Sequence, residues 1–553
     1  MAKIESNEEN PHLGNSHKWL DGDGVALDAM LKSGDAPHKS SLRLAKCYSG
    51  TVTGVRARTV EIEVCASNGA PQFTIVGLPD IAVKEAKDRV ATAISNSGFA
   101  RPEANITVNL APADVRKEGP IYDLPIAICL LSAADKVKCS DLSEWGIVGE
   151  LALSGAVRRV RGVLPIVMEM RRIGKKGVIV PVENAEEAAV VDGISVYPVR
   201  TLHEALEFLQ GNISIMPVFA DLSRLVLAAR DTGEDFADVK GQDFAKQAIE
   251  VAVAGGHNLM MIGVPGCGKT MLAKRIPSIL PPLTVGEALE VTRIHSVAGV
   301  LKPGEPIVLH RPFRAPHHTA STLGLLGGGT HPRPGEVSLA HRGVLFLDEM
   351  PEFSRNALEV LRQPLEDGHV SISRVVGTYD YPSRFMLVAA MNPCPCGYFG
   401  DERHRCRCSH VKRIEYRNRV SGPLLDRIDI QIEVAPVSYD MLSQLPTGES
   451  SAKIRERVMQ ARAIQEARFA DDPEVFCNAE MRSRDIARYC RLDARAQAAL
   501  RDKIEQLDLS ARAYDRVLKV ARTIADLRGV EAVGDEDVNM AARWRALDRN
   551  YWI

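Results

Sequence analysis

The sequence predicts an α/β protein in which two blocks of mixed strands and helices precede a helical segment. In residues 45–213, stretches of alternating apolar and polar residues are interleaved with stretches of helical spacing. In residues 237–437, apolar runs read as buried strands, at 258–262, 343–347 and 385–391. Helical spacing dominates 477–545. A chain of 553 residues has room for about three or four domains.

Composition excludes several classes of protein. The chain is 45% apolar and 25% charged, as in an ordinary soluble globular protein. Its net charge of −2 gives no overall attraction to nucleic acid, so any such contact needs a local basic surface. No run approaches about 18 consecutive apolar residues, which predicts no membrane span. The N-terminus lacks a secretory signal, and most of the 11 cysteines stand singly, so we expect a reducing, cytoplasmic location.

The N-terminal block is expected to have an α+β fold. Residues 1–44 are polar and predict a mostly disordered tail. Strand patterns follow at 50–55, 59–64, 72–76 and 106–110, with helical patterns at 82–95 and 124–134 and a further strand ending at 180. A connector over 214–236 ends this block.

A phosphate-binding loop is the most specific motif in the chain. Residues 263–270 read G-x-x-x-x-G-K-T between an apolar strand and a helix, which is the context that such a loop requires. Lys269 would reach the β- and γ-phosphates of a nucleoside triphosphate, and the Thr270 hydroxyl would bind Mg²⁺. Cys267 is interpreted as a small filler. The predicted nucleotide-binding residues are Gly263, Val264, Pro265, Gly266, Cys267, Gly268, Lys269 and Thr270.

An acidic pair follows the next buried strand. The run 343–347 ends on Asp348 and Glu349, about 80 residues after the loop. Asp348 would hold the Mg²⁺ shell, and Glu349 would polarise the attacking water. Taken alone, such a pair is often only the solvated end of a strand.

Two stretches of the N-terminal block carry a resemblance to a known family. Residues 76–80 (V-G-L-P-D) and 117–125 (K-E-G-P-I-Y-D-L-P) resemble the Lon-protease-like domain that opens the ComM/YifB family of magnesium-chelatase-like ATPases. The motif order over 45–553 resembles that family, which implies a Lon-like domain at 45–213, an AAA+ core at 237–437 and a helical lid at 438–553. Ile121 and Leu164 fall where a Lon protease has its serine and lysine. Neither side chain can do that chemistry, so a non-proteolytic module is expected.

The resemblance also implies the rest of a hydrolysis site. Asn392 would be the sensor that orients water, and residues 238–255 would line the adenine. Arg427 would enter the neighbouring subunit's site as an arginine finger; the alternative is a structural arginine paired with Asp426 or Asp429. Arg512 is the preferred second sensor, with Arg516 as the other candidate. A finger supplied by a neighbour implies a homo-oligomeric ring, expected to be a hexamer.

Two insertions are expected to contact the substrate. One is the Gly- and His-rich segment between the loop helix and Asp348. The other is a β-hairpin ahead of Asn392, in which 377–382 reads as the turn. In related clades these elements face the central pore. Lys302, Arg374 and Arg384 are candidate phosphate contacts, but single basic residues on loops are usually just solvated.

A cysteine cluster follows Asn392. Cys394, Cys396, Cys406 and Cys408 form two C-x-C pairs nine residues apart, which predicts four thiolate ligands for Zn²⁺. His404 and His410 are alternative ligands, and a reduced loop without metal is the other interpretation. Basic residues between and after the cysteines suit contact with a phosphate backbone.

The expected function is that of a ComM-like ring ATPase that uses ATP and Mg²⁺. It would bind single-stranded, forked or junction DNA and drive branch migration during recombination in natural transformation. One alternative is a motor of the magnesium chelatase kind that acts on a protein partner. An ATP-dependent protease is the third hypothesis, and Ile121 and Leu164 argue against it.

Overall fold

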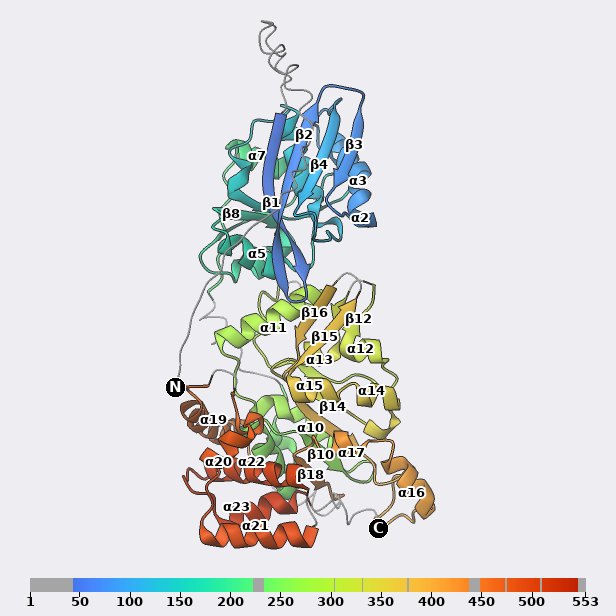
Figure 1. Cartoon of the computed structure of the whole chain (residues 1–553), viewed down its shortest axis with the longest axis vertical. Helices are drawn as coiled ribbons and strands as arrows, with labels where there is room; N and C mark the ends of the chain where they lie inside the picture. Colours follow the sequence, from blue (N-terminus) through green and yellow to red (C-terminus); the bar gives the residue numbers. More distant parts are fainter. Residues whose placement is uncertain are drawn as a thin grey trace, which may run out of the picture.

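Three regions follow one another along the long axis of the molecule (Figure 1). The computed structural model describes residues 43–221, 233–302, 304–330, 332–374, 377–436, 448–472, 475–507 and 510–545. Strand β1 begins at Arg43, inside the segment predicted to be a tail. The rest of that predicted tail lies outside the described residues.

The N-terminal region is built on a seven-stranded mixed sheet of order β3-β4-β2-β1-β5-β8-β9. Strands β1, β2 and β4 pair antiparallel, and the remaining neighbours pair parallel. Helices α3, α4, α5 and α7 complete this region and bury one continuous core against the sheet. The bounds are β1 (Arg43–Thr53), β2 (Arg56–Ser67), β3 (Gln72–Val76), α3 (Ala86–Asn96), β4 (Asn105–Ala111), α4 (Asp123–Ala133), β5 (Trp145–Ile147), α5 (Val163–Arg172), β8 (Gly177–Pro181), β9 (Ser195–Val199) and α7 (Leu202–Gln210).

Strands β1 and β2 differ from the prediction in length. The sequence suggested two short strands, 50–55 and 59–64, whereas the structure has one long hairpin that turns at Gly54 and Val55. The predicted helix 82–95 is also divided, into α2 (Ile81–Lys84) and α3, with Glu85 between them. Both differences arise at short turns, where a periodic pattern carries little signal.

The central region is a five-stranded sheet of order β11-β14-β17-β10-β18, and all of its strands are parallel. Strands β10, β14 and β17 are buried along their whole length. A parallel strand covered on both faces reads as a continuous apolar run, which explains why the sequence revealed them. The bounds are α9 (Asp243–Gly255), β10 (Leu259–Ile262), α10 (Lys269–Ile279), α11 (Val285–Ala298), β11 (Phe313–Arg314), β14 (Val344–Leu347), α15 (Arg362–Asp367), β17 (Met386–Met391), α16 (His410–Arg417), α17 (Gly422–Leu425) and β18 (Ile430–Glu433).

The two insertions fold as hairpins. The first carries α12 (Thr322–Leu326) and pairs β12 (Gly327–Gly328) with β13 (Arg333–Pro334). The second pairs β15 (His369–Arg374) with β16 (Gly377–Pro382). Residues 377–382 are therefore a strand, and the prediction that they form the turn was wrong.

The C-terminal region is helical. Helix α9 of the core packs against α19 and α22, so the lid shares one apolar core with the central sheet. Within the described part of the chain, no helix combines the length and apolar character that crossing a membrane requires. The bounds are α19 (Ser451–Arg468), α20 (Ser483–Tyr489), α21 (Ala494–Leu507), α22 (Ala511–Leu527) and α23 (Asp535–Arg543).

Candidate functional site at two edges of the core sheet

The predicted phosphate loop lies where β10 ends, at what we call the carboxyl edge of the core sheet. The loop runs from the end of β10 to α10, which begins at Lys269. Gly266 and Gly268 have φ of 78° and 98°, a region that glycine adopts without steric cost. The loop therefore depends on these two glycines to curl its backbone towards a bound anion.

Side chains from three adjacent strands meet at this loop. The Lys269 Nζ donates to the Gly263 carbonyl oxygen at 2.6 Å and to Asn392 Oδ1 at 3.2 Å. The Thr270 hydroxyl donates to Asp348 Oδ2 at 2.8 Å. Lys269, Thr270, Asp348 and Asn392 therefore form one hydrogen-bonded group, although the sequence spreads them over more than 120 positions.

Glu349 differs from Asp348 in its backbone conformation and in its exposure. Its φ is 50°, in the left-handed region, and its side chain is 56% exposed. His318 lies beside it, with Nδ1 4.0 Å from Glu349 Oε2. His318 was not predicted as a site residue. Its signal was its position just after β11, because β11 pairs in parallel with β14 and both strands end at the same edge.

Cys267 fills the base of the loop. Its side chain is buried, its Sγ lies 3.7 Å from Lys269 Nζ, and burial raises the pKa of its thiol. Nearby, Gln242 Nε2 donates to the Ala435 carbonyl oxygen at 2.6 Å. Gln242 lies within the segment expected beside the adenine, and its Nε2 also lies 3.4 Å from the Cys267 carbonyl oxygen, so this part of the segment is next to the phosphate loop.

Arg427 lies at the opposite end of the strands, which we call the amino edge. It precedes β18, whose first residue, Ile430, pairs with Leu259 at the start of β10. The phosphate loop follows the far end of β10, about 13 Å away at a rise of about 3.3 Å per residue. Arg427 is mostly buried, donates to the Pro423 carbonyl oxygen at 2.7 Å and forms an ion pair with Glu366 of α15. Its partner is therefore Glu366, rather than Asp426 or Asp429.

The two candidates for the second sensor lie at the same amino edge. Arg512 is 67% exposed, and its Nη1 lies 4.0 Å from Asp426 Oδ2. Arg516, one turn later on α22, forms an ion pair with buried Asp429. Burial raises the pKa of Asp429, but the charge of Arg516 and a contact from His257 outweigh that effect and hold the pKa well below its usual range. The more exposed Arg512 is therefore better placed to reach outward.

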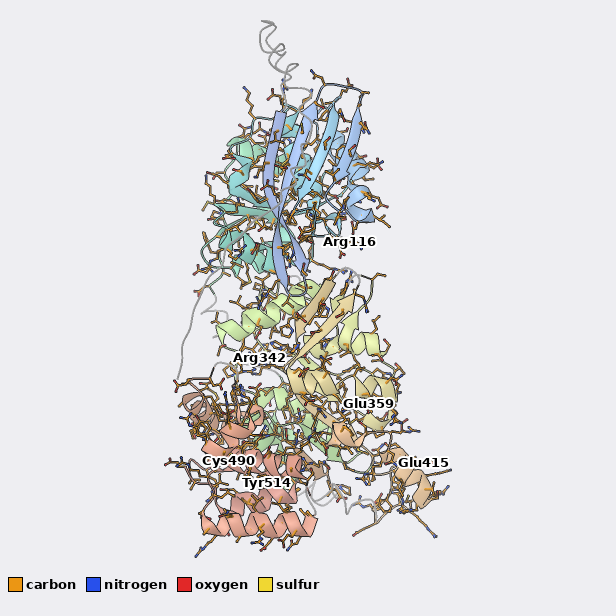
Figure 2. The ribbon with its side chains drawn as sticks, in the orientation of Figure 1. Arg116, Arg342, Glu359, Glu415, Cys490 and Tyr514 are labelled. Atoms are coloured by element: carbon orange, nitrogen blue, oxygen red, sulfur yellow. The ribbon has the colours of Figure 1, made fainter. Side chains whose placement is uncertain are left out.

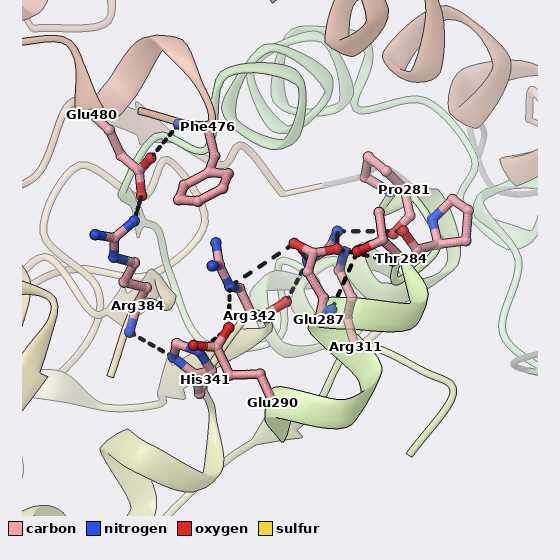
Figure 3. A network of polar contacts seen from close by, with 11 residues as sticks. Pro281, Thr284, Glu287, Glu290, Arg311, His341, Arg342, Arg384, Phe476 and Glu480 are labelled. Atoms are coloured by element: carbon pink, nitrogen blue, oxygen red, sulfur yellow. Dashed lines mark hydrogen bonds and ion pairs between the residues drawn. The ribbon is translucent and has the colours of Figure 1, made fainter. Parts of the chain in front are cut away.

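A polar network also occupies the amino edge (Figure 3). Arg342, two positions before the start of β14, packs over the Phe476 ring at 4.4 Å, and its Nε lies 3.2 Å from Glu290 Oε2. Arg384 precedes β17 and packs over the same ring at 5.2 Å. Arg342, Arg384 and Phe476 line a cavity of about 730 Å³ between the core and the lid, together with Arg427 and others. The network joins the lid to the two strands that carry Asp348 and Asn392, and the sequence did not reveal it.

The four clustered cysteines come together. Their Sγ atoms all lie within 4.8 Å of one another, and those of Cys394, Cys396 and Cys406 are 3.4–3.7 Å apart. Four sulfurs at about 2.3 Å from one Zn²⁺ in a tetrahedron would be about 3.8 Å apart. His404 instead lies 2.8 Å from Asp401. The residues present fit a four-thiolate metal site.

The cysteine loop also touches the phosphate loop. A Cβ added at Gly397 would lie 2.6 Å from the Pro265 side chain, so the two loops are in close contact. Cys394 follows Asn392 by two residues. A metal held here would therefore fix the chain on two sides of the proposed nucleotide site.

The three candidate phosphate contacts do not form one patch. Arg374 is exposed at the end of β15, with Nε 3.5 Å from the Gly329 carbonyl oxygen of the first insertion. Arg384 belongs to the amino-edge network, and Lys302 is exposed beside the N-terminal region. Of the three, only Arg374 joins the two insertions.

The positions expected to carry protease chemistry are apolar. Ile121 and Leu164 are both buried in the N-terminal core. The Leu164 amide N–H donates to Glu187 Oε1 at 3.2 Å, which is a structural contact. This region retains a packed fold without a nucleophile at those two positions.

Comparison with known proteins places these features in a family. The family model "Magnesium chelatase, subunit ChlI" matches residues 235–442. "Subunit ChlI of Mg-chelatase" matches residues 62–184, and "Magnesium chelatase, subunit ChlI C-terminal" matches residues 448–545. All three regions of the structure are thus represented.

Full-length relatives are also found. The chain is 44% identical to competence protein ComM of Haemophilus influenzae over 516 residues, which cover 92% of this chain and 98% of that protein. It is 42% identical to YifB of Escherichia coli over 510 residues, with the same coverage. Lon protease 2 of Bacillus subtilis is 28% identical over 125 residues, or 22% of each chain. The predicted α/β fold with an AAA+ core is confirmed, and the chain belongs to the ComM/YifB family of magnesium-chelatase-like proteins.

Proposed function

We propose that the protein is an ATP-driven, ring-forming DNA motor that promotes branch migration when incoming DNA recombines during natural transformation. One observation carries the motor part of this proposal. The residues expected to bind and cleave ATP are divided between two opposite edges of one sheet, so that a single chain holds no complete site. The DNA part rests on the family and on the competence protein among its relatives.

The carboxyl edge supplies the binding half of the site. Backbone N–H groups of the loop and the start of α10 would hold the phosphates, and Thr270 and Asp348 would hold Mg²⁺. Lys269 would exchange its bonds to loop carbonyls for bonds to phosphate oxygens. Asn392 would orient the attacking water, and Glu349 would polarise it.

The amino edge supplies the other half. Arg427 and Arg512 both lie there, about one strand length from their own phosphate loop. In a head-to-tail ring this edge would face the carboxyl edge of the next subunit. Arg427 would then leave Glu366 and stabilise the charge that develops on the transferred phosphoryl group, and we expect six such interfaces.

Zinc is proposed as a structural metal. Cys394, Cys396, Cys406 and Cys408 would hold it as thiolates, with all four positions filled by protein. When bound, zinc would close the loop that contacts Pro265. The basic residues of this loop and of α16 would then be presented to a phosphate backbone.

The insertions are the proposed contact with DNA. The hairpins β12–β13 and β15–β16 lie side by side, because Arg374 approaches the Gly329 carbonyl oxygen and the Tyr381 hydroxyl donates to the Pro332 carbonyl oxygen at 2.7 Å. Exposed Arg374 would bind phosphate. Arg374→Ala should then weaken binding about equally for all DNA sequences and reduce the slope of its salt dependence by about 1.

The test is ATP hydrolysis and strand exchange by the purified protein. Single-stranded or forked DNA should stimulate hydrolysis, and the protein with ATP should branch-migrate a four-way DNA junction. Lys269→Ala should do neither, and added salt should weaken DNA binding. Absence of DNA binding at low salt would refute the DNA part of the proposal.

A second candidate function is that of a motor that acts on a protein partner. The similarity of the chain to magnesium chelatase subunits favours this alternative. It predicts ATP hydrolysis that is indifferent to DNA. The protease hypothesis is disfavoured by apolar Ile121 and Leu164, and it would require casein degradation by the purified protein.

A further inference from the structure

The N-terminal region has a role still to be assigned once proteolysis is set aside. Its most unusual element is the β1–β2 hairpin, which extends towards the core (Figure 1). In the last part of the hairpin, β1 and β2 pair only with each other, from Ser49↔Val60 to Thr53↔Arg56. The neighbouring strand β4 pairs with β2 from Glu61 onward, and β5 pairs with β1 at Tyr48. The base of the extension packs on its own region, where the Tyr122 hydroxyl donates to the Gly50 carbonyl oxygen at 3.3 Å. A free two-stranded ribbon is marginally stable in water, so the tip needs another surface to pack on.

That surface is the second insertion. Val55, at the tip, is 7% exposed and belongs to the apolar cluster of the core together with Val370, Ile372 and Tyr381 of β15 and β16. At Gly54, a Cβ would lie 2.9 Å from the Asp380 carbonyl oxygen of β16. The tip of the hairpin is therefore in close contact with the β15–β16 hairpin.

Other contacts keep the whole N-terminal region in this position. Glu187 forms a hydrogen bond with Ser296 of α11, and the Gly162 N–H donates to the Ser296 carbonyl oxygen at 3.1 Å. Arg159 donates to the Leu301 carbonyl oxygen at 2.9 Å. Arg116 lies on the side of the N-terminal region that faces the core (Figure 2), close enough to influence the pKa of Tyr379. The region therefore contacts both α11 and β16.

The β15–β16 hairpin also contacts the first insertion, through Tyr381 and Arg374. The hairpin is itself a two-stranded ribbon outside the core sheet. Without Val55 it would lose apolar cover at its buried residues, Val370 and Ile372. Its position therefore depends on the tip of β1–β2.

We propose that the β1–β2 hairpin is a brace, with Gly54 and Val55 as positioning residues that hold β15–β16 in place for its partner, a DNA phosphate backbone. The choice of DNA as partner rests on the proposed function, whereas the bracing contact does not. The Lon-like fold then serves as a rigid support, which requires a packed core but no nucleophile. The brace acts on coupling to DNA, because it touches none of the residues proposed to bind ATP.

The test uses the full chain and two matched substitutions on the same strand pair. Val55→Asp places a charge in the buried contact, where it can be solvated only if the tip undocks. Leu44→Asp makes a similar change at the other end of β1, at a side chain that is 62% exposed. Val55→Ala is the milder variant if Val55→Asp fails to fold.

The first measurement is hydrogen exchange of the amides in 369–374 and 377–382, without DNA. Val55→Asp should speed exchange there about tenfold or more, whereas Leu44→Asp should leave it unchanged. The second is ATP hydrolysis. Val55→Asp should keep the basal rate and lose most of the stimulation by single-stranded DNA, and Leu44→Asp should keep both.

Unchanged exchange in the folded Val55→Asp protein would overturn the brace. Faster exchange with full DNA stimulation would also overturn the proposal, since the brace would then not serve DNA. If the wild-type protein shows no stimulation by DNA, the proposed function fails instead, and the exchange measurement alone decides whether the hairpin is braced.

Discussion

The division of the site between two edges predicts that two inactive variants restore activity to each other. Lys269→Ala removes the phosphate-binding half and leaves Arg427 intact, whereas Arg427→Ala does the reverse. Each variant alone should lose about 10³-fold or more in hydrolysis, because an arginine finger is worth about 10³–10⁵ in rate. Arg427 and its own loop lie at opposite ends of β10, which is about 13 Å long, so no change of rotamer within one chain should complete the site.

The expected recovery follows from the arrangement. An interface is active when an Arg427→Ala subunit, with its intact loop, meets the amino edge of a Lys269→Ala subunit. In a random equal mixture this occurs at about one half times one half of the interfaces, so about one quarter of the wild-type rate per interface should return. The fraction does not depend on how many subunits the ring contains. Coupled hydrolysis between neighbours would lower it.

The assay is steady-state phosphate release after the two variants have been mixed and allowed to exchange subunits. Lys269→Ala mixed with Glu349→Gln is the matched control, because both changes lie at the carboxyl edge and every interface stays defective. That control should not recover. A rate for the first mixture no higher than the mean of the two separate variants would refute the assignment of Arg427 to a neighbour's site.

Three further predictions concern single groups. Glu349→Gln should retain ATP binding but slow hydrolysis by about 10²–10⁴, as measured by equilibrium binding beside phosphate release, and undiminished hydrolysis would identify another base. Elemental analysis should find one Zn²⁺ per chain, and Cys396→Ser should lose it; a metal-free wild type would favour the reduced-loop alternative. Asp429→Asn should lower the free energy of unfolding in denaturant by about 3–5 kcal/mol, because it leaves Arg516 without its buried partner. Since the folded-state pKa of Asp429 is lowered, wild type should lose this stabilisation as pH falls below about 4, and the variant should not.

The sequence revealed the carboxyl edge well because its signals are local. Each buried parallel strand is a short apolar run, and each candidate site residue follows directly at its end, as Asp348 and Asn392 do. The loop glycines report their own backbone geometry. The positions of these side chains and glycines at the carboxyl edge can therefore be predicted from the residues next to them in the sequence.

The amino edge was harder to predict because its contacts are non-local. The Arg427–Glu366 pair joins residues 61 positions apart, and the Arg516–Asp429 pair joins residues 87 positions apart. A sequence does not distinguish a solvated charged residue before a strand from one that forms an ion pair with a distant residue. The same limit hid the position of Val55, which the alternating pattern placed at the end of a strand and the structure places at a buried hairpin tip.

The two edges also differ in how much of them the rest of the chain covers. At the amino edge, the lid residue Phe476 contacts Arg342 and Arg384, and Arg516 of the lid contacts Asp429. At the carboxyl edge, Glu349 is 56% exposed, and residues 265–266 of the phosphate loop are exposed too. The chain therefore presents two unlike surfaces at opposite ends of one sheet. In the proposed head-to-tail ring these two surfaces would meet at every interface, and the division of the site would make each subunit depend on its neighbour.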